Sequence, residues 1–406
     1  MTAPLPIACV HVSSALGGSE RVLLDFVARA PRHGIAPHVI LPKPGPLEEA
    51  VREAGATVAV AAAPERFLSV SQRAGFSLAH AVDFATGLRA WSRAIAAELD
   101  RMAAGPLGPP AVLYSNGFKA HLACAPLRRF PRVWHLHEFP PEGLGAAWKV
   151  AAGTLPTAVI ANSRSVAAAW AGLAGPRPEV VVNGVDLALF APAPRTFWIH
   201  EQLDLPHDVR LIGMPAVFAR WKGHLLVVQA FERAAARVDA AHLVLVGGPI
   251  YDTVAERGYA EELVRRVRCS SMNGAPCATP LTGRIHFLKF QEEPWRLYPE
   301  FDVAVHFSTR PEPFGRVVVE AMACGVPVIA AREGGPVEIV EDGVSGWLIP
   351  PGDVVTLANT MVEALSADRS ALGAAARSRA EALFSADRFA LEVAEVLKRV
   401  AARGAR

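Results

Sequence analysis

Short apolar runs separated by helical or polar stretches dominate the first half of the chain. Each run is only a few residues long, which is typical of a strand that is covered on both faces. The run at residues 7–12 leads into a glycine-rich loop, and residues 21–30 then show helical periodicity. Further strand candidates lie at residues 37–41, 57–61, 111–114, 133–136, 158–161 and 180–182. This alternation predicts an α/β architecture, a parallel sheet with helices on both faces.

A Pro-rich and polar stretch between residues 190 and 210 interrupts the pattern, and we interpret it as an interdomain connection. A second series of strand candidates follows at residues 211–214, 242–246, 285–288, 303–307, 327–329 and 346–349. Because 406 residues are too many for one ordinary core, two doubly wound domains are expected. We predict a first Rossmann-like domain at residues 1–195, a second at residues 196–385, and a final amphipathic helix within residues 386–406.

Two carboxylates lie eight residues apart in the stretch Glu312-Pro-Phe-Gly-Arg-Val-Val-Val-Glu320. The Pro-Phe-Gly turn precedes an amphipathic segment, so Glu312 should lie just before a helix and Glu320 about two turns inside it. Gly315 lets a ligand approach the backbone, and the helix start from Phe314 to Val317 offers N–H groups to a phosphate. Two acids around an anion site suit a nucleotide-sugar. The alternative is one capping and one solvated glutamate, with Phe314 simply packing.

The same stretch continues into Ala-Met-Ala-Cys-Gly-Val-Pro-Val-Ile-Ala330, and Gly334-Gly335-Pro-Val-Glu338 and Asp342-Gly-Val-Ser-Gly346 follow it. This region closely resembles the signature region of the retaining glycosyltransferases of family 4, and the first domain resembles that family more loosely. The resemblance implies the GT-B fold, in which two Rossmann-like domains face each other across a cleft and the last helix crosses back to the first domain. It also implies transfer of a hexose from a nucleoside-diphosphate sugar, for which we expect a UDP-sugar, to an acceptor hydroxyl.

The resemblance further implies roles for individual residues. Glu312 would hold hydroxyls of the sugar, Glu320 would hold the ribose, and the N–H groups of residues 314–317, including that of Arg316, would contact the diphosphate. In this family retention is usually ascribed to attack by the acceptor on the face that the leaving group departs from, without a covalent intermediate on Glu312.

Lys222 and Gly223 follow the first strand of the second domain and precede a helix. A cation at this place can reach phosphates at the Phe314 turn and neutralise a departing diphosphate. The alternative is that Arg220 and Lys222 are solvated loop cations. The resembled family usually has an arginine about five residues before this lysine, where this chain has Val217, and whether Arg220 supplies the missing charge stays open.

Three residues of the first domain are candidates for the same site. His137 stands at the carboxyl end of a strand, the edge where open α/β sheets bind ligands, and it matches a histidine that the family places near the reacting sugar. Gly17 and Gly18 resemble the family's first glycine loop, which comes near the donor phosphates. A histidine that satisfies polar groups of the core, and glycines required by a tight turn, are the alternatives.

Several other polar residues have weaker signals. Asn116 and Lys119 follow a strand on the acceptor side of the first domain, but packing is the favoured reading for both. His306 and Ser308 precede the two-glutamate stretch on the strand that feeds it, and packing is again favoured for them. A turn is the expected role of Asn183-Gly-Val-Asp186, which also matches the family.

Composition and charge exclude several classes of protein. The formal net charge of +2 argues against a dedicated nucleic-acid protein and against a large polybasic membrane patch. The five cysteines have no C-x-x-C spacing, which indicates reduced thiols in a cytoplasmic protein, although Cys269 and Cys277 share a polar loop and could pair if oxidised. The chain has no basic leader and no apolar run that could span a bilayer, so we expect a soluble protein, with peripheral contact at the inner membrane face left open.

The sequence offers no sign of a bound metal or of another cofactor. No Asp-x-Asp stands at a strand end, and no paired His or Cys ligands have metal-binding spacing. Neither a G-x-x-x-x-G-K-[ST] loop nor a G-x-S-x-G elbow is present. We therefore expect a metal-independent enzyme in which cations and helix-end amides hold the diphosphate.

Other functions on the same fold compete with this reading. The protein could bind a nucleotide-sugar without turnover, which the substituted Val217 favours slightly. It could also be a sugar phosphorylase or an epimerase. The acceptor is not encoded in any motif, and the oligomeric state is not either.

Overall fold

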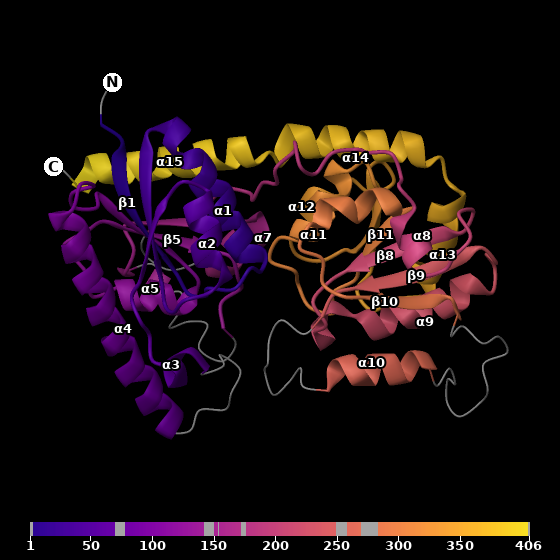
Figure 1. Ribbon diagram of the computed structural model, residues 1–406, viewed down its shortest axis with the longest axis horizontal. Helices are drawn as coiled ribbons and strands as arrows, with labels where there is room; N and C mark the ends of the chain where they lie inside the picture. Colours follow the sequence, from indigo (N-terminus) through magenta and orange to yellow (C-terminus); the bar gives the residue numbers. More distant parts are fainter. Residues whose placement is uncertain are drawn as a thin grey trace. The chain divides into compact units, whose positions relative to one another are not determined.

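The computed structural model describes residues 3–69, 78–141, 150–152, 154–171, 176–248, 258–268 and 283–404. The chain divides into two units, each built around one parallel sheet (Figure 1). Unit 1 comprises Met1–Gly184 and Ala386–Arg406, and unit 2 comprises Val185–Ser385. The predicted α/β class with two Rossmann-like sheets is confirmed.

The described strands of unit 1 follow the order β3-β2-β1-β4-β5-β6-β7, and neighbouring strands are parallel. Their bounds are β1 Leu5–His11, β2 Ile35–Leu41, β3 Thr57–Val60, β4 Val112–Asn116, β5 Arg132–Leu136, β6 Ala158–Ala161 and β7 Glu179–Val180. The helices are α1 Gly18–Arg29, η1 Ala30–His33, α2 Pro46–Glu53, α3 Glu65–Ser69, α4 Leu78–Ala104, α5 Phe118–Cys124, α7 Arg164–Trp170 and α15 Ala386–Gly404.

The central strand β1 shows why the apolar runs are continuous and not alternating. Ile7 and Cys9 pack into a cluster with α1, α2 and α15, whereas Ala8 and Val10 pack into another cluster with α4 and α5. Successive side chains of a strand point to opposite faces, so a strand covered on both faces must be apolar at every position. The C-terminal helix α15 belongs to the first of these clusters, where Phe389 is completely buried.

The described strands of unit 2 follow the order β10-β9-β8-β11-β12-β13, again with parallel neighbours. Their bounds are β8 Arg210–Pro215, β9 Ala241–Val246, β10 Ile285–Leu288, β11 Val303–His306, β12 Val328–Ala331 and β13 Gly346–Ile349. The helical elements are α8 Trp198–Gln202, η2 Arg220–Lys222, α9 His224–Ala235, α10 Tyr259–Arg268, η4 Pro294–Arg296, η5 Tyr298–Glu300, α11 Arg316–Ala323, α12 Pro336–Ile339, α13 Val354–Ser366 and α14 Arg369–Leu383.

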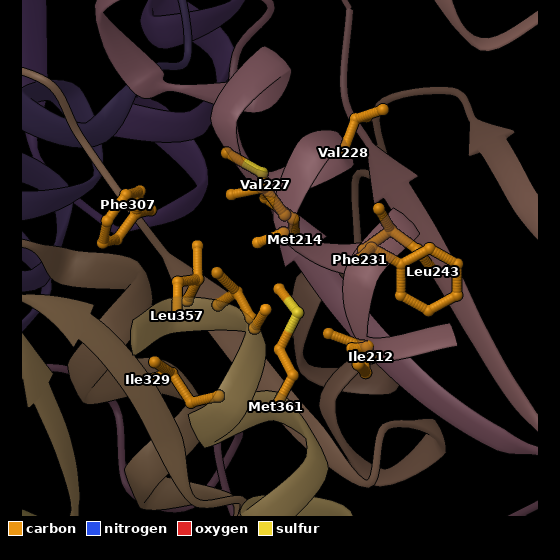
Figure 2. Packing of buried hydrophobic residues seen from close by; sticks show 14 of the residues in the cluster. Ile212, Met214, Val227, Val228, Phe231, Leu243, Phe307, Ile329, Leu357 and Met361 are labelled. Carbon is orange, nitrogen blue, oxygen red and sulfur yellow. The ribbon is translucent and has the colours of Figure 1, made fainter. Parts of the chain in front are cut away.

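The main core of unit 2 lies between the sheet and helices α9 and α13. Figure 2 shows Ile212 of β8, Phe231 of α9 and Met361 of α13 gathered there, and all three are completely buried. Burial of such side chains contributes roughly 1.5–3 kcal/mol each. This core fixes β8 and β11 as neighbours at the centre of the sheet, and the loops after these two strands carry Lys222 and Glu312.

The connection between the units is attached to unit 2 from Val185 onward. The amide of Val185 donates to the carbonyl of Phe384 at 2.9 Å, and the Arg377 guanidinium donates to the carbonyl of Phe190 at 2.7 Å. Thr196 donates to the Glu300 carboxylate through both its amide and its hydroxyl at 2.8 Å. The structure therefore divides the chain after residue 184, whereas the sequence pattern places the boundary after residue 195.

Two further expectations concern the membrane and the cysteines. Across the described residues, none of the helices combines the length and the apolar character that crossing a bilayer requires. Cys9, Cys124 and Cys324 are buried free thiols. The loop with Cys269 and Cys277 lies outside the described residues.

Candidate active site

Lys222 is positioned by a close contact between two loops of unit 2. The loop after β8 forms η2, and Gly223 follows it with a φ of +77°, in the region that favours glycine. A side chain at Gly223 would clash with the carbonyl oxygen of Phe307. The Thr309 amide donates to the Trp221 carbonyl at 2.7 Å, which ties the loop after β11 to the loop after β8. The sequence indicated each loop separately, and the structure shows that they meet.

The backbone of Glu312 packs closely against the glycine pair at residues 334–335. It forms an isolated parallel bridge with Gly334, and the Gly335 amide donates to the Glu312 carbonyl at 2.8 Å. Gly334 has a φ of +71°, and a side chain there would clash with the Glu312 backbone. The glycine pair of the motif thus has a structural reason, which is the close approach of two chain segments.

The carboxylate of Glu312 receives three hydrogen bonds. Lys222 Nζ lies 2.6 Å from Glu312 Oε2, His306 Nε2 lies 3.0 Å from it, and Ser308 Oγ lies 3.2 Å from it. Burial alone would raise the pKa of Glu312, but the charge of Lys222 and the hydrogen bond from His306 outweigh burial and hold this pKa well below its usual range. The packing role expected for His306 and Ser308 is therefore incomplete, because both contact the candidate acid.

The helix after Glu312 begins where the sequence predicts. Gly315 is the N-cap of α11, and Arg316 and Val317 begin its first turn. Phe314 is buried and packs against Phe384 with ring centroids 6.1 Å apart. The first amides of a helix have no intrahelical acceptor, and they carry the positive end of the helix dipole. The helix start that the motif predicts is thus present, and the binding of an anion there stays a prediction.

Glu320 is buried, and this overturns the alternative of a solvated helix glutamate. Only 4% of the residue is exposed. Arg316 Nε donates to Glu320 Oε1 at 2.8 Å, and the Tyr298 hydroxyl donates to Oε2 at 2.8 Å. Burial and the charge of Glu320 raise the pKa of Tyr298 well above its ordinary value, so its hydroxyl stays a donor. The sequence did not indicate Tyr298, because its proximity to Glu320 depends on the packing of η5 against α11.

Arg220 contacts two residues of α10. Its guanidinium forms an ion pair with Glu262 of α10, with 2.5 Å between the nitrogen and the oxygen, and it lies 4.9 Å from the centre of the Tyr259 ring. The Arg220 side chain is 48% exposed. Val217, at the position of the family's arginine, is half-buried. The structure does not bring Arg220 to the site, so its compensation for Val217 stays a hypothesis.

His137 of unit 1 follows β5 at the carboxyl end of the sheet. Its Nε2 lies 3.0 Å from Asn116 Oδ1, and its ring centroid lies 4.0 Å from that of His135. Burial, together with the nearby His11, lowers the pKa of His137 to about 3. His137 is therefore neutral at physiological pH and acts as a hydrogen-bonding group without charge.

The glycine loop of unit 1 lies at the start of α1. Gly17 is the N-cap residue, and its amide donates to Glu20 Oε2 at 3.1 Å. Gly18 has open space around the position that a side chain would occupy. Lys119 has a structural role, because its ammonium donates to the carbonyls of Phe67 and Leu68 at 2.8 and 2.6 Å.

The candidate residues are divided between the two units. Unit 2 brings together Lys222, Glu312, the first turn of α11 and Glu320, while Arg220 lies apart. Unit 1 presents Gly17, Gly18 and His137. Among the described residues, no three His, Cys, Asp or Glu side chains gather in an arrangement that could hold a metal ion.

Two family models match the chain, one in each unit. The model of the glycosyl transferases group 1 matches residues 197–379, and the model of glycosyltransferase family 4 matches residues 16–189. The D-inositol 3-phosphate glycosyltransferase of Mycolicibacterium gilvum is 34% identical over 200 residues, which cover 49% of this chain and 42% of that protein. The N-acetyl-alpha-D-glucosaminyl L-malate synthase of Bacillus anthracis is 31% identical over 187 residues, which cover 46% and 44%. The matched part therefore spans less than half of the length of these relatives.

Solved structures match over nearly the whole chain. Anabaena HepE in complex with UDP-glucose is 26% identical, with a TM-score of 0.77 and coverage of 97% of this chain and 100% of that chain. The sucrose-phosphate synthase of Thermosynechococcus elongatus has a TM-score of 0.76 at 21% identity and covers 98% and 100%. These likenesses confirm that the two Rossmann-like domains are of the GT-B type.

Proposed function

Because the chain belongs to glycosyltransferase family 4, we propose that it transfers a hexose from a UDP-sugar to an acceptor hydroxyl, with retention of configuration and without a metal ion. The observation that carries this proposal is the Lys222–Glu312 ion pair beside the first turn of α11. Unit 2 thereby has a cation, helix-end amides and a carboxylate close to one another. The complex of HepE with UDP-glucose supports a UDP-sugar as the donor.

The proposed mechanism assigns the diphosphate to Lys222 and to the amides at the start of α11. Departure of the nucleotide leaves an oxocarbenium-like sugar and develops negative charge on the diphosphate. Donors that are already in place stabilise this charge without reorganisation. Glu312 would accept hydrogen bonds from sugar hydroxyls, and Glu320 would accept one from the ribose. In unit 1, to which the proposal assigns the acceptor, the neutral His137 would contribute a hydrogen bond.

The experiment that tests this proposal follows the fate of the nucleotide. The protein is incubated with UDP-glucose, UDP-galactose, UDP-N-acetylglucosamine, GDP-mannose and ADP-glucose, with and without an acceptor. Release of UDP together with a glycosylated product is expected. D-inositol 3-phosphate and L-malate are the first acceptors to test, because the names of two relatives contain them. A sugar phosphate as product would indicate a phosphorylase, an isomerised donor would indicate an epimerase, and binding without any UDP release would indicate a binding protein.

Removal of divalent metals should leave transfer essentially intact. Lys222 and the α11 amides take the place that a metal ion would have at the diphosphate. The measurement compares initial rates in excess EDTA with initial rates in excess Mn²⁺ or Mg²⁺. Activity that is lost in EDTA and restored by either ion would contradict the proposal that Lys222 and the α11 amides stabilise the diphosphate charge.

Glu320→Ala should weaken the binding of bare UDP about 10- to 150-fold. A hydrogen bond to a charged group contributes roughly 1.5–3 kcal/mol, and this factor is the corresponding change in affinity. Calorimetric titration with UDP measures it. Since Glu320 also accepts from Tyr298 and Arg316, Glu320→Gln and Tyr298→Phe are the controls for loss of packing. UDP affinity that is unchanged in Glu320→Ala would contradict the proposed hydrogen bond between Glu320 and the ribose.

A further inference from the structure

The three hydrogen bonds to the Glu312 carboxylate all end on one oxygen. Lys222 Nζ, His306 Nε2 and Ser308 Oγ contact Oε2 at 2.6, 3.0 and 3.2 Å. Among the described residues, none donates a hydrogen bond to Oε1. One oxygen of the carboxylate is thus fixed by the protein, and the other remains available as an acceptor.

His306 makes this contact from a buried position, where a polar side chain is energetically unfavourable. It is the last residue of β11, which lies between β8 and β12, and only 4% of it is exposed. Its Nε2 donates to Glu312, and its Nδ1 is buried and finds no hydrogen-bond partner among the residues that the structure describes. Buried polar atoms are normally paired, and the exceptions need a reason. The hydrogen bond to Glu312 is such a reason. An apolar residue at this strand end would pack as well but could not donate to the carboxylate.

Ser308 completes the arrangement from the loop after β11. It is 1% exposed, and its hydroxyl lies 3.4 Å from His306 Nε2 and 3.2 Å from Glu312 Oε2. His306 ends β11, and Ser308 lies just beyond it, in the loop that the contact between Thr309 and Trp221 ties to the loop after β8. They therefore differ from Lys222, whose long side chain can turn.

We propose that His306, assisted by Ser308, is a positioning residue that holds Oε2 of Glu312 so that Oε1 faces the hexose hydroxyls while Lys222 serves the diphosphate. This inference rests on the proposed function. When the donor binds, the Lys222 ammonium must divide its hydrogen bonds between the diphosphate and Glu312. Without His306 and Ser308, the carboxylate would then be free to rotate. An acid misplaced by about 1 Å can cost on the order of a hundredfold in rate, so a fixed donor pair matters for turnover.

The test replaces the donors of His306 and Ser308 and reads turnover and binding separately. His306→Leu should lower kcat about 10- to 100-fold and weaken UDP-glucose binding about 3- to 10-fold, with the affinity for bare UDP within about threefold. His306→Gln, whose amide N–H can donate to Oε2, should recover most of the loss. Ser308→Ala should lower kcat about 3- to 10-fold, and it serves as the second variant should His306→Leu fold poorly.

His242→Leu is the matched control. His242 also stands in a strand of unit 2 and is bonded to a histidine, with its Nδ1 3.0 Å from His286 Nε2, but it makes no contact with Glu312. Its variant should keep kcat within about threefold, so a loss in His306→Leu alone is specific to the site.

Two results would overturn the inference. Turnover that is unchanged in His306→Leu and Ser308→Ala shows that catalysis does not depend on the orientation of Glu312 by these two donors. Equal losses of UDP and UDP-glucose affinity in His306→Leu, without recovery in His306→Gln, show a general collapse of the site in place of a positioning role. These failures differ from failure of the proposed function, in which the wild-type protein releases no UDP. In that case the difference between UDP and UDP-glucose affinities still decides whether His306 acts through Glu312.

Discussion

Glu312→Ala should lower kcat at least about a hundredfold while leaving the affinity for bare UDP within about threefold. The acid contacts the sugar in the proposed complex, so nucleotide binding does not need it, whereas the reacting sugar does. A hundredfold loss corresponds to about 2.7 kcal/mol of transition-state stabilisation, which lies within the range of a charged hydrogen bond in a desolvated site. Steady-state kinetics with UDP-glucose and calorimetry with UDP measure the two quantities.

Two other variants control the Glu312 experiment. Glu312→Gln keeps the shape of the side chain and can accept hydrogen bonds, so it should lose less than Glu312→Ala. Glu293→Ala removes a glutamate of unit 2 that is 54% exposed and paired only with Arg296 in the described structure. Such a surface pair contributes little, and kcat should stay within about twofold. A Glu312→Ala protein with nearly normal turnover would contradict the assignment of Glu312 to the sugar.

Lys222→Ala should lower kcat about 100- to 1,000-fold. Removal of one donor that stabilises a developing negative charge typically has this effect, about 2.7–4 kcal/mol. The variant should also weaken UDP binding, since the ammonium interacts with the diphosphate in the ground state as well. It further leaves Glu312 without its cation, and the pKa of Glu312 should rise because the charge of Lys222 helps to keep that pKa low.

Lys222→Arg and Lys289→Ala separate charge from geometry. Lys222→Arg retains the charge but presents a planar, longer group, so partial activity is expected. Lys289 is exposed beyond β10, and its loss should leave kcat nearly unchanged. Rates and UDP affinity are measured for all three proteins. A Lys222→Ala enzyme that keeps more than a third of the wild-type kcat would show that another cation stabilises the diphosphate.

Sequence alone predicts the fold and the chain position of the site, because both depend on local pattern. Strands that are covered on both faces require continuous apolar runs, and the loop before α11 requires Gly315 where the chain turns. The spacing of Glu312 and Glu320 places one acid before the helix and one inside it, and the structure has both there. The buried state of Glu320 agrees with a ligand-binding role.

The contacts that complete the site depend on how the elements pack in space, and no local pattern reveals them. Tyr298 reaches Glu320 because η5 packs near α11, and His306 reaches Glu312 because β11 delivers both His306 and the loop that follows. The direction of Arg220 is likewise set by Glu262 and Tyr259 on α10. The division after residue 184 depends on side chains such as Arg377 that attach the connection to unit 2.

Calorimetry on Glu312→Ala and Glu320→Ala, first with UDP and then with UDP-glucose, tests the orientation of the donor most directly. The account predicts that Glu320→Ala loses about 10- to 150-fold in affinity for UDP itself, whereas Glu312→Ala binds UDP within about threefold of the wild type and loses only the increment that the glucose adds. If Glu312→Ala abolished the binding of bare UDP while Glu320→Ala bound it normally, the donor would lie in the opposite direction, and the assignment of the site would be wrong.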